Sequence, residues 1–511
     1  MQNRGYDYLG ALAAPNSAAA LAKFKQFGGV IPDDLKVSAA RTGFLSMPKG
    51  VQGLFAIAWL TWKAAFRFRL FLVLCFLLLG AVVGLPLLLK DDGTARGFTQ
   101  ILLTYTLSSI TALLGLSTLW LACGTLARDI EECQMQMVAV KPISRWQIWL
   151  GKWLGIMLLN AALLAISGGS VYLLLLWRAT KLPPPEQAIL RNEILLARGS
   201  AREKSVDKEI DAQTDQVLQE RLRKNPVSPA DMLEVRKQIR EQVKAAFQVV
   251  PSEYWRPWKI NLGSAKNSLR NRPLQLRIKF NSADKSPSGT FAGIWRVGVP
   301  QKTMLWQSEP MSLSPDTFHE FPIPANLFDE DGLLTITFLN PNNTALLFPL
   351  EDGMEVLYRE GGFGLNFMRG LAIVFCWMAA LAALGLASAS LLSFPVAAFF
   401  SLAVLMIALS SGTLAGAVEE GSIGNYNAEK GRHGSTPADW IVIPMFRALL
   451  WLVNLAKEFS PIDSLSTGRS ITWAQLGRAF GQIVLLLGGV MAAIGIAIFS
   501  RRELATAQGT Q

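Results

Sequence analysis

Long uncharged runs, separated by charged segments, dominate this chain. The runs are Leu70 to Leu89, a stretch within Gly97 to Ala127, Trp153 to Trp177, two halves of Gly370 to Val418 divided at Ser393-Phe394-Pro395, and Ala479 to Ser500. At about 1.5 Å of rise per residue, twenty helical residues match a hydrocarbon core of about 30 Å. The pattern therefore predicts a polytopic α-helical membrane protein with six transmembrane helices.

Two further segments have the composition of helices at a membrane surface. Gln52 to Arg69 (QGLFAIAWLTWKAAFRFR) places Trp, Phe and Leu among basic residues, which is typical of an interfacial helix and also fits the positive flank of the first span. Trp440 to Ala456 is apolar but short, and it contains a proline and an arginine. We expect this second segment to be an external interfacial or re-entrant helix, with a full span as the weaker alternative.

The insert from Arg178 to Gly362 contains two different patterns. In its first part, apolar residues recur at helical spacing in two charged stretches, at Val206, Ile210, Val217 and Leu222 and then at Met232, Val235, Ile239 and Val243. These stretches predict an antiparallel helical hairpin. In the second part the period becomes two, and strands are expected at Leu274–Phe280, Thr290–Val299, Leu333–Leu339 and Met354–Arg359. Such strands indicate an antiparallel β-sandwich.

The distribution of basic residues predicts the orientation. Residues 1–69 hold nine Lys or Arg against three Asp, so we expect a cytosolic N-terminus. The insert between spans three and four is then extracytoplasmic, and six crossings return both termini to the cytosol. The expected domains are 1–50, a poorly ordered cytosolic tail; 51–177, the interfacial helix and spans 1–3; 178–362, the extracytoplasmic insert; and 363–511, spans 4–6 with the helix near 440–456.

Composition fits a membrane protein better than a nucleic-acid-binding protein. Hydrophobic residues make up 51% of the chain, and the mean hydropathy is +0.30. Much of the net charge of +11 lies near the ends of apolar runs, where membrane lipids account for it, so we expect no nucleic-acid partner. The four cysteines lie in or beside the apolar runs, which indicates neither a disulfide framework nor a zinc site.

No motif for catalysis is present in the sequence. HExxH and GxSxG are absent, and Gly151-Lys152 lacks the upstream glycine and the following Ser or Thr of a phosphate-binding loop. His319 and Glu320 are adjacent and should point to opposite faces of a strand, so we interpret them as a surface pair rather than a metal site. We expect that the chain is not an enzyme and binds no cofactor or metal itself.

The charged segment Leu126 to Gly155 (LARDIEECQMQMVAVKPISRWQIWLGKWLG) separates the second and third runs. The charges in its first half suit a short helix on the membrane surface. Pro142 then breaks the chain, and Ser144 with Gln147 three residues later predicts a capped start for the third span. By the orientation above, this segment faces the cytosol.

The order of these features resembles the ABC-2 type permeases, the membrane-spanning subunits of ABC transporters. The resemblance rests on AWLTWKAAFRFR before the first span, RDIEECQMQMVAVKPISRWQIWLGKWLG between spans two and three, and FSRREL at the end of the last span. It implies an exporter in the cytoplasmic membrane that pairs with a second permease copy, as a homo- or heterodimer, and uses ATP hydrolysed by a separate ATPase subunit. In this family the segment between spans two and three docks on the ATPase, and this role would fall on Arg128, Asp129, Glu131, Glu132, Lys141 and Arg145.

Two other classes of function remain open. One is a membrane-anchored sensor or scaffold whose external β domain binds a ligand or an envelope protein. The other is a membrane enzyme that acts on lipid or glycan, which the lack of a discernible nucleophile or acid/base pair disfavours. The large insert departs from the compact members of the family, and it leaves the transported substrate open.

Overall fold

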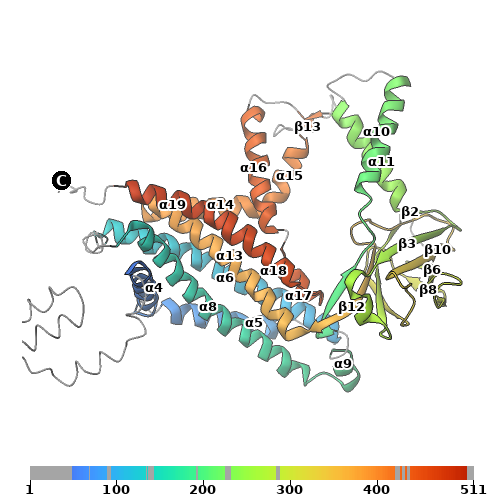
Figure 1. Cartoon of the computed structure of the whole chain (residues 1–511), viewed down its shortest axis with the longest axis horizontal. Coiled ribbons are helices and arrows are strands. Elements are labelled where there is room, and N and C mark those ends of the chain that lie inside the picture. The colour runs from blue at the N-terminus through green and yellow to red at the C-terminus, as the bar shows by residue number, and fades with distance from the viewer. Residues whose placement is uncertain are drawn as a thin grey trace, which may run out of the picture.

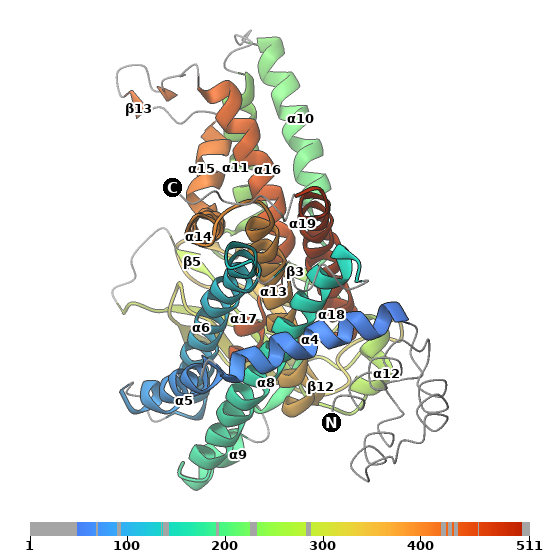
Figure 2. The same ribbon diagram turned by 90° about the vertical axis from the view of Figure 1, so that its left-hand side faces the viewer.

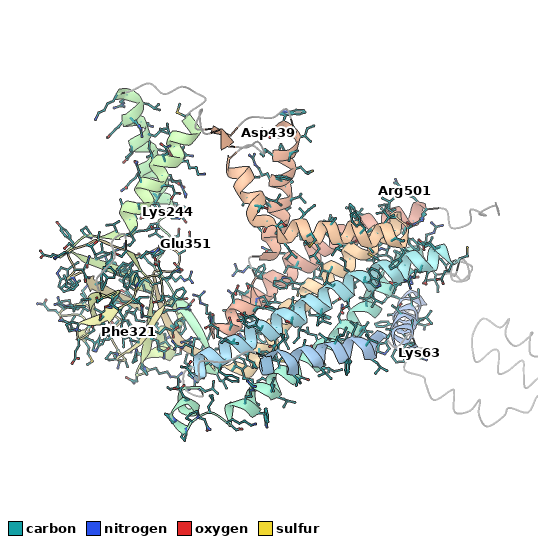
Figure 3. All side chains as sticks on the ribbon, turned by 180° about the vertical axis from the view of Figure 1, so that it is seen from behind. Lys63, Lys244, Phe321, Glu351, Asp439 and Arg501 are labelled. Atoms are coloured by element: carbon teal, nitrogen blue, oxygen red, sulfur yellow. The ribbon has the colours of Figure 1, made fainter. Side chains whose placement is uncertain are left out.

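The computed structural model describes residues 49–67, 70–88, 94–133, 135, 143–190, 194–224, 232–282, 288–420, 426–427, 432–433, 438–457 and 459–502. Almost all of the expected N-terminal tail lies outside these ranges. The described residues form a bundle of long helices with a β-sandwich at one end (Figure 1). We call the two ends of the bundle the β-sandwich end and the Arg145 end; Figure 3 labels Phe321 in the sandwich and Arg501 at the opposite end.

Within the described ranges, four helices are long and apolar enough to cross a membrane. They are α6 (Ala95–Glu131), α8 (Arg145–Ala179), α13 (Phe363–Leu391) and a composite helix, Trp473–Arg501, built from α18 (Trp473–Ala479), the π-helical η3 (Phe480–Gly488) and α19 (Gly489–Arg501). Each coincides with one of the predicted apolar runs. The chain is therefore a membrane protein with several candidate membrane-spanning helices and a separate β domain.

Small residues bring these helices into close contact. A Cβ added to Gly385 of α13 would lie 2.7 Å from Cβ of Ala122 in α6, and one added to Gly495 of α19 would lie 3.0 Å from Cα of Ala387 in α13. Such close approach is the usual way in which helices associate in a bilayer, where burial of apolar surface gives little net attraction. α13 is consequently the central helix of the bundle.

The apolar helices at the two remaining predicted spans are shorter than these four. α5 (Leu70–Leu88) has an apolar stretch at Leu72–Leu85, and α14 (Phe394–Leu409) has 16 residues. Both expose large apolar side chains, with Phe76 at 78% and Phe399 at 75%. Apolar surface on this scale is stable when lipid covers it. The predicted break before α14 is confirmed, since α13 ends at Leu391 and Ser393 is the N-cap residue of α14.

α4 (Lys49–Arg67) lies across the Arg145 end of the bundle and crosses α8 (Figure 2). At the crossing, a Cβ on Gly151 would lie 2.9 Å from the carbonyl oxygen of Leu54, and one on Gly155 would lie 2.7 Å from that of Ala58. On its other face α4 exposes Trp59 and Leu60. α4 is thus an amphipathic helix set across the bundle rather than an extension of α5.

A helical arm leaves the side of the bundle beyond α14. It consists of α15 (Ser411–Glu420), the short strands β13 (Tyr426–Asn427) and β14 (Arg432–His433), and α16 (Asp439–Lys457). The two helices lie side by side and leave the bundle at a steep angle (Figure 1), with Asp439 at the tip (Figure 3). α16 covers the expected interfacial or re-entrant helix, and it exposes Trp440, Ile441 and Trp451. The short α17 (Pro461–Ser466) then leads to α18.

The β domain is an antiparallel sandwich. One sheet has the strand order β1-β12-β4-β9, the second has β3-β10-β6-β7 with β8 also paired to β6, and a small third sheet has β2-β11-β5. Their bounds are β1 (Leu196–Ala201), β2 (Val249–Val250), β3 (Trp255–Asn261), β4 (Leu274–Ile278), β5 (Asn281–Ser282), β6 (Phe291–Val297), β7 (Trp306–Gln307), β8 (Met311–Leu313), β9 (His319–Ile323), β10 (Leu333–Leu339), β11 (Leu346–Leu347) and β12 (Met354–Gly362). The two large sheets enclose one core, in which Trp295 contacts Phe338 with ring centroids 4.6 Å apart. Short helices α9 (Pro184–Ile189), η2 (Gly263–Ala265) and α12 (Lys266–Leu269) complete the insert.

The predicted helical hairpin is confirmed as α10 (Asp207–Lys224) and α11 (Met232–Gln248). Ile210, Ile239 and Val243 form its core, and Leu218 packs there instead of the expected Val217, which is 41% exposed. The hairpin follows β1, a strand that the sequence pattern did not predict, so it is inserted into the sandwich rather than placed before it. An ion pair between Lys244 and Glu351 joins the hairpin to the sandwich, with Lys244 Nζ 3.5 Å from Glu351 Oε1 (Figure 3).

Candidate functional site

The described part of the charged segment Leu126 to Gly155, residues 126–133, 135 and 143–155, lies at the Arg145 end, at the opposite end of the bundle from the β-sandwich. Asp129 of α6 forms an ion pair with Lys152 of α8, whose Nζ donates to Asp129 Oδ2 at 2.5 Å and to the Thr125 carbonyl oxygen at 2.7 Å. Lys152 is 7% exposed, so its charge needs both acceptors. Gly151 and Lys152, which superficially suggest a phosphate-binding loop, serve helix packing and this ion pair.

Glu131 and Arg128 hold the start of α14. Glu131 Oε1 accepts the backbone N–H of Phe394 at 2.8 Å, which satisfies a donor that the first turn of α14 leaves without an intrahelical acceptor. A carboxylate is also favourable at this position because the helix dipole is positive there. The Arg128 guanidinium lies over the Phe394 ring, 4.3 Å from its centroid. These two contacts fix α14 to the end of α6.

Arg145 and Arg502 provide the complementary contacts at two helix C-termini. Arg145 Nη1 donates to the carbonyl oxygens of Phe499, Ser500 and Arg502 at 3.0, 2.8 and 2.7 Å. Arg502 Nη1 donates to the carbonyl oxygen of Ser390 at 3.0 Å, near the end of α13. A guanidinium suits the carbonyl-rich, partly negative end of a helix. The Arg145 end therefore joins α6, α8, α13, α14 and α19 through charged side chains.

The structure brings together four of the six residues expected to dock an ATPase: Arg128, Asp129, Glu131 and Arg145. Glu132 is exposed and is the C-cap residue of α6, and Lys141 lies outside the described residues. The predicted start of the third span is confirmed, because Gln147 Oε1 accepts the backbone N–H of Ser144 at 3.0 Å. The five described residues of the predicted set thus lie at one helical junction, and several of them also hold it together.

A second charged cluster, which we call the ionic junction, connects the β-sandwich to the bundle. It comprises Arg96, Arg198, Arg202, Arg277, Glu320, Glu355 and Arg469. Glu355, Arg277 and Glu320 stand in register on three neighbouring strands, β12, β4 and β9. Glu320 Oε2 pairs with Arg96 of α6 at 2.8 Å, and Glu355 Oε2 pairs with Arg469 of the loop after α17 at 2.7 Å. In each of these two ion pairs, one residue belongs to the bundle and the other to the sandwich.

Backbone contacts strengthen the same junction. The Arg198 N–H donates to the Gly468 carbonyl oxygen at 2.9 Å, and the Ser470 N–H donates to the Arg198 carbonyl oxygen at 2.7 Å, so the loop after α17 extends the sheet beyond its edge strand β1. Asn366 of α13, fully buried, donates to the Arg469 carbonyl oxygen at 2.8 Å and accepts the Ile471 N–H at 2.7 Å. The sandwich is consequently fixed to the bundle at three points: this loop, the start of α6, and the direct passage from β12 into α13.

The interpretation of His319 and Glu320 as a surface pair was wrong for Glu320, whose side chain is 9% exposed. Burial alone would raise the pKa of Glu320, but the positive charges of Arg198, Arg96 and Arg277 outweigh it and hold this pKa below its ordinary value. His319 instead stacks on Phe280 and contacts Thr317. Within the described ranges, no group of three or more His, Cys, Asp or Glu residues is arranged to hold a metal ion.

Apart from Glu320, sequence reasoning did not single out the residues of the ionic junction. Arg277 and Glu355 occupy polar positions of alternating strands, where a solvated side chain is the usual expectation. The signal that could have identified them is the excess of charge on one face of the sheet, opposite the apolar face. Comparisons with protein-family models, curated proteins and solved structures found no match to this chain.

Proposed function

We propose that this chain is the membrane-spanning permease subunit of an ABC transporter, an exporter driven by ATP hydrolysis on a separate ATPase subunit. The observation that carries the proposal is the placement of the described part of the charged segment Leu126 to Gly155. It lies at the end of the bundle away from the β-sandwich, and its charged side chains contact the ends of α6, α8, α14 and α19. A displacement of this segment would move all four helices.

The proposed topology has six spans, α5, α6, α8, α13, α14 and the composite helix Trp473–Arg501, and the arm of α15 and α16 leaves the bundle after the fifth span. The Arg145 end and both termini face the cytosol, the β-sandwich lies outside, and α16 lies in the external interface. α13 then runs from the sandwich, where it follows β12 directly, to the Arg145 end. In a dimer with a second permease copy, ATP binding to the partner subunits would bias this arrangement between two states.

The positions of Glu131 and Glu132 determine which substitution is the better test of the proposed docking surface. Reversing the charge of Glu131 would remove the acceptor of the α14 backbone and damage the bundle itself. Glu132 is exposed at the end of α6, and a lysine there would suit the negative C-terminal end of this helix, so Glu132→Lys reverses a charge on the surface. Glu309→Lys, on the exposed surface of the sandwich, is a matched control.

The experiment is affinity purification of the tagged protein from native membranes in mild detergent, with the co-purified chains identified by mass spectrometry. We expect an ATPase subunit with a phosphate-binding loop in near-equal amount, lost from Glu132→Lys and retained by Glu309→Lys. Recovery of external proteins without any nucleotide-binding chain, from all three proteins, would contradict the proposal.

One observation favours the alternative of an external sensor or scaffold. β3 is an edge strand of its sheet, and the exposed Tyr254 and Trp255 lie at its start. Arg296 stacks on Trp255 with its guanidinium carbon 4.8 Å from the ring centroid. Aromatic and arginine side chains of this kind are enriched at protein interfaces. Under this alternative, Trp255→Ala would abolish the recovery of an external partner, and Glu132→Lys would have no effect.

A further inference from the structure

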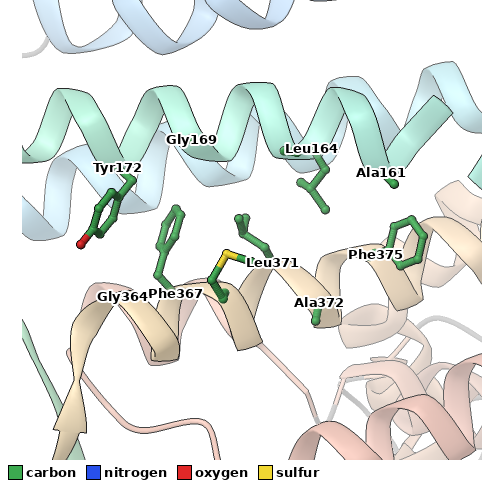
Figure 4. A pocket seen from close by; sticks show the side chains of 11 residues that line it. Ala161, Leu164, Gly169, Tyr172, Gly364, Phe367, Leu371, Ala372 and Phe375 are labelled. Carbon is green, nitrogen blue, oxygen red and sulfur yellow. The ribbon is translucent and has the colours of Figure 1, made fainter. Parts of the chain in front are cut away.

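A groove of about 570 Å³ runs between α8 and α13, in the half of the bundle next to the β-sandwich (Figure 4). Its walls include Ala161, Gly169 and Tyr172 of α8 and Phe367, Met368 and Phe375 of α13. A volume of this size is in the range of about 300–1,000 Å³ that is usual for small-molecule sites. The groove is therefore large enough for a ligand.

The groove opens onto the outer surface of the bundle. A Cβ on Gly168 would lie 2.5 Å from Leu371, so the two helices touch there, whereas a Cβ on the adjacent Gly169 would meet no atom within 4 Å. Met368, which lines the groove, is 63% exposed, and Leu173, the residue after Tyr172 in α8, is 67% exposed. The groove is thus continuous with the apolar surface that α8 and α13 present to lipid.

The length and the polarity of the groove match one leaflet of a lipid bilayer. From Ala161 to Tyr172 the helix rises about 16 Å, roughly half of a hydrocarbon core of about 30 Å. Tyr172 is the one lining residue with a polar side chain, and it lies toward the β-sandwich end (Figure 4). Tyrosine is favoured at the level of lipid headgroups, because its ring is apolar and its hydroxyl is polar. Tyr172 also stacks on Phe363, with ring centroids 6.3 Å apart, which forms a firm wall at this end.

We propose that the groove binds one acyl chain of a membrane lipid, in the leaflet next to the β-sandwich, with the ester end of the lipid beside the Tyr172 hydroxyl. Hydrocarbon is the solvent along this surface, and the remaining lining side chains offer it no polar group. The proposal rests on the membrane placement of α8 and α13 and does not depend on the permease function.

The test is photolabelling of the full chain in phosphatidylethanolamine–phosphatidylglycerol vesicles that contain phosphatidylcholine with a diazirine in its acyl chain. We expect labelled peptides from Ala161–Tyr172 and Gly364–Phe375. Gly169→Leu should fill the groove and remove most of this labelling, because the leucine side chain takes the volume that the acyl chain would occupy. Gly80→Leu is the matched control, because a Cβ on this exposed glycine of α5 also meets no atom within 4 Å.

A second variant, Ala161→Leu, fills the other end of the groove and should lower the labelling in the same way. Equal labelling of the wild type and both filled variants, with all proteins unfolding at the same temperature, would overturn the proposal. So would efficient cross-linking of Ala165→Cys between two copies of the chain in the same vesicles, because the groove would then be covered by a second copy.

Discussion

Lys152 is a buried cation with two acceptors, Asp129 and the Thr125 carbonyl oxygen. The ion pair is asymmetric, since the Lys152 side chain is 8% exposed and the Asp129 side chain is 34% exposed. Removal of the carboxylate would leave the ammonium group buried with a single carbonyl acceptor, whereas removal of both charges would leave an apolar contact. The cost of breaking such a pair is mainly the cost of the charge left behind.

We expect Asp129→Ala to lower the free energy of unfolding by about 3 kcal/mol, the lower part of the range for a broken buried pair, because Asp129 is partly solvated. Asp129→Asn combined with Lys152→Met should recover most of this loss. Chemical unfolding of the wild type, Asp129→Ala and the double variant in the same detergent measures both effects. A double variant as unstable as Asp129→Ala would show that the pair matters for more than its unpaired charge.

Glu320 makes stability dependent on pH. The pKa of Glu320 is lower in the folded chain than its ordinary value, because the neighbouring arginines outweigh the effect of burial. The folded state therefore binds fewer protons than the unfolded state near this pKa, and the ionised carboxylate stabilises the folded state at neutral pH. The advantage of the wild type over Glu320→Gln should be complete above about pH 4.3, the ordinary pKa of glutamate, and should be lost as the pH falls through the lower folded-state pKa. Unfolding of both proteins between pH 7 and 3 measures this difference. A constant difference across that range would contradict the assignment.

At the residue scale, the sequence predicted which charged residues lie together better than it predicted what those residues contact. It identified Arg128, Asp129, Glu131 and Arg145 as one charged group, and the structure places them at one junction. Their contacts with Phe394, Lys152 and the end of α19 join segments far apart in the chain, and a linear pattern contains no information about such pairs. Glu320 was misjudged for the same reason, because its partners Arg96 and Arg198 lie more than a hundred residues earlier in the chain.

At the scale of elements, the crossing of α4 over α8 depends on two glycines one helical turn apart. A methyl group on Gly155 would lie 2.6 Å from Cβ of Thr61 and 2.7 Å from the backbone oxygen of Ala58, so α4 must move to admit it. Close crossing of this kind holds α4 across the end of the bundle, next to Ile143 and Gln147 at the start of α8.

Gly155→Ala should therefore destabilise the chain by about 1–3 kcal/mol, the usual cost of overpacking. Gly84→Ala is the control, because a Cβ on this glycine of α5 has no neighbour within 4 Å, and alanine favours a helix. Thermal unfolding of both variants in the same detergent measures the difference. Equal unfolding temperatures would mean that α4 does not pack closely on α8.

Long elements were predictable, and short ones were not. α6, α8 and α13 follow from uninterrupted apolar runs, and β10 follows from alternation along Leu333–Leu339. β1, with the sequence LARGSA, lacks alternation because five of its six residues are buried, so nothing in its pattern distinguished it from a loop. The angle between α15 and α14 also escaped prediction, since it depends on how the arm packs rather than on composition.

At the scale of the whole molecule, charged clusters mark both ends of one helix bundle. α13 follows β12 directly and ends near Arg502, so it links the ionic junction to the Arg145 end. The proposal places these ends on opposite sides of a membrane. Cys133, exposed after α6, and Glu309, exposed on the sandwich, are suitable probes of this arrangement.

In a background that lacks Cys75, Cys123 and Cys376, a membrane-impermeant maleimide should label Cys133 only after the cells are permeabilised. Glu309→Cys, in the same background with Cys133→Ala, should react in intact cells. Labelling of both cysteines from the same side of the membrane would contradict the six-span topology.

The most direct test of the central claim is photocrosslinking in native membranes from a benzophenone amino acid placed at Glu132, with the same amino acid at Glu309 as the control. The account predicts that position 132 cross-links to a chain with a phosphate-binding loop, that ATP changes the yield, and that position 309 gives no such product. Cross-linking of position 132 to lipid alone, in membranes where the protein is folded, would contradict the assignment of this chain as a permease subunit.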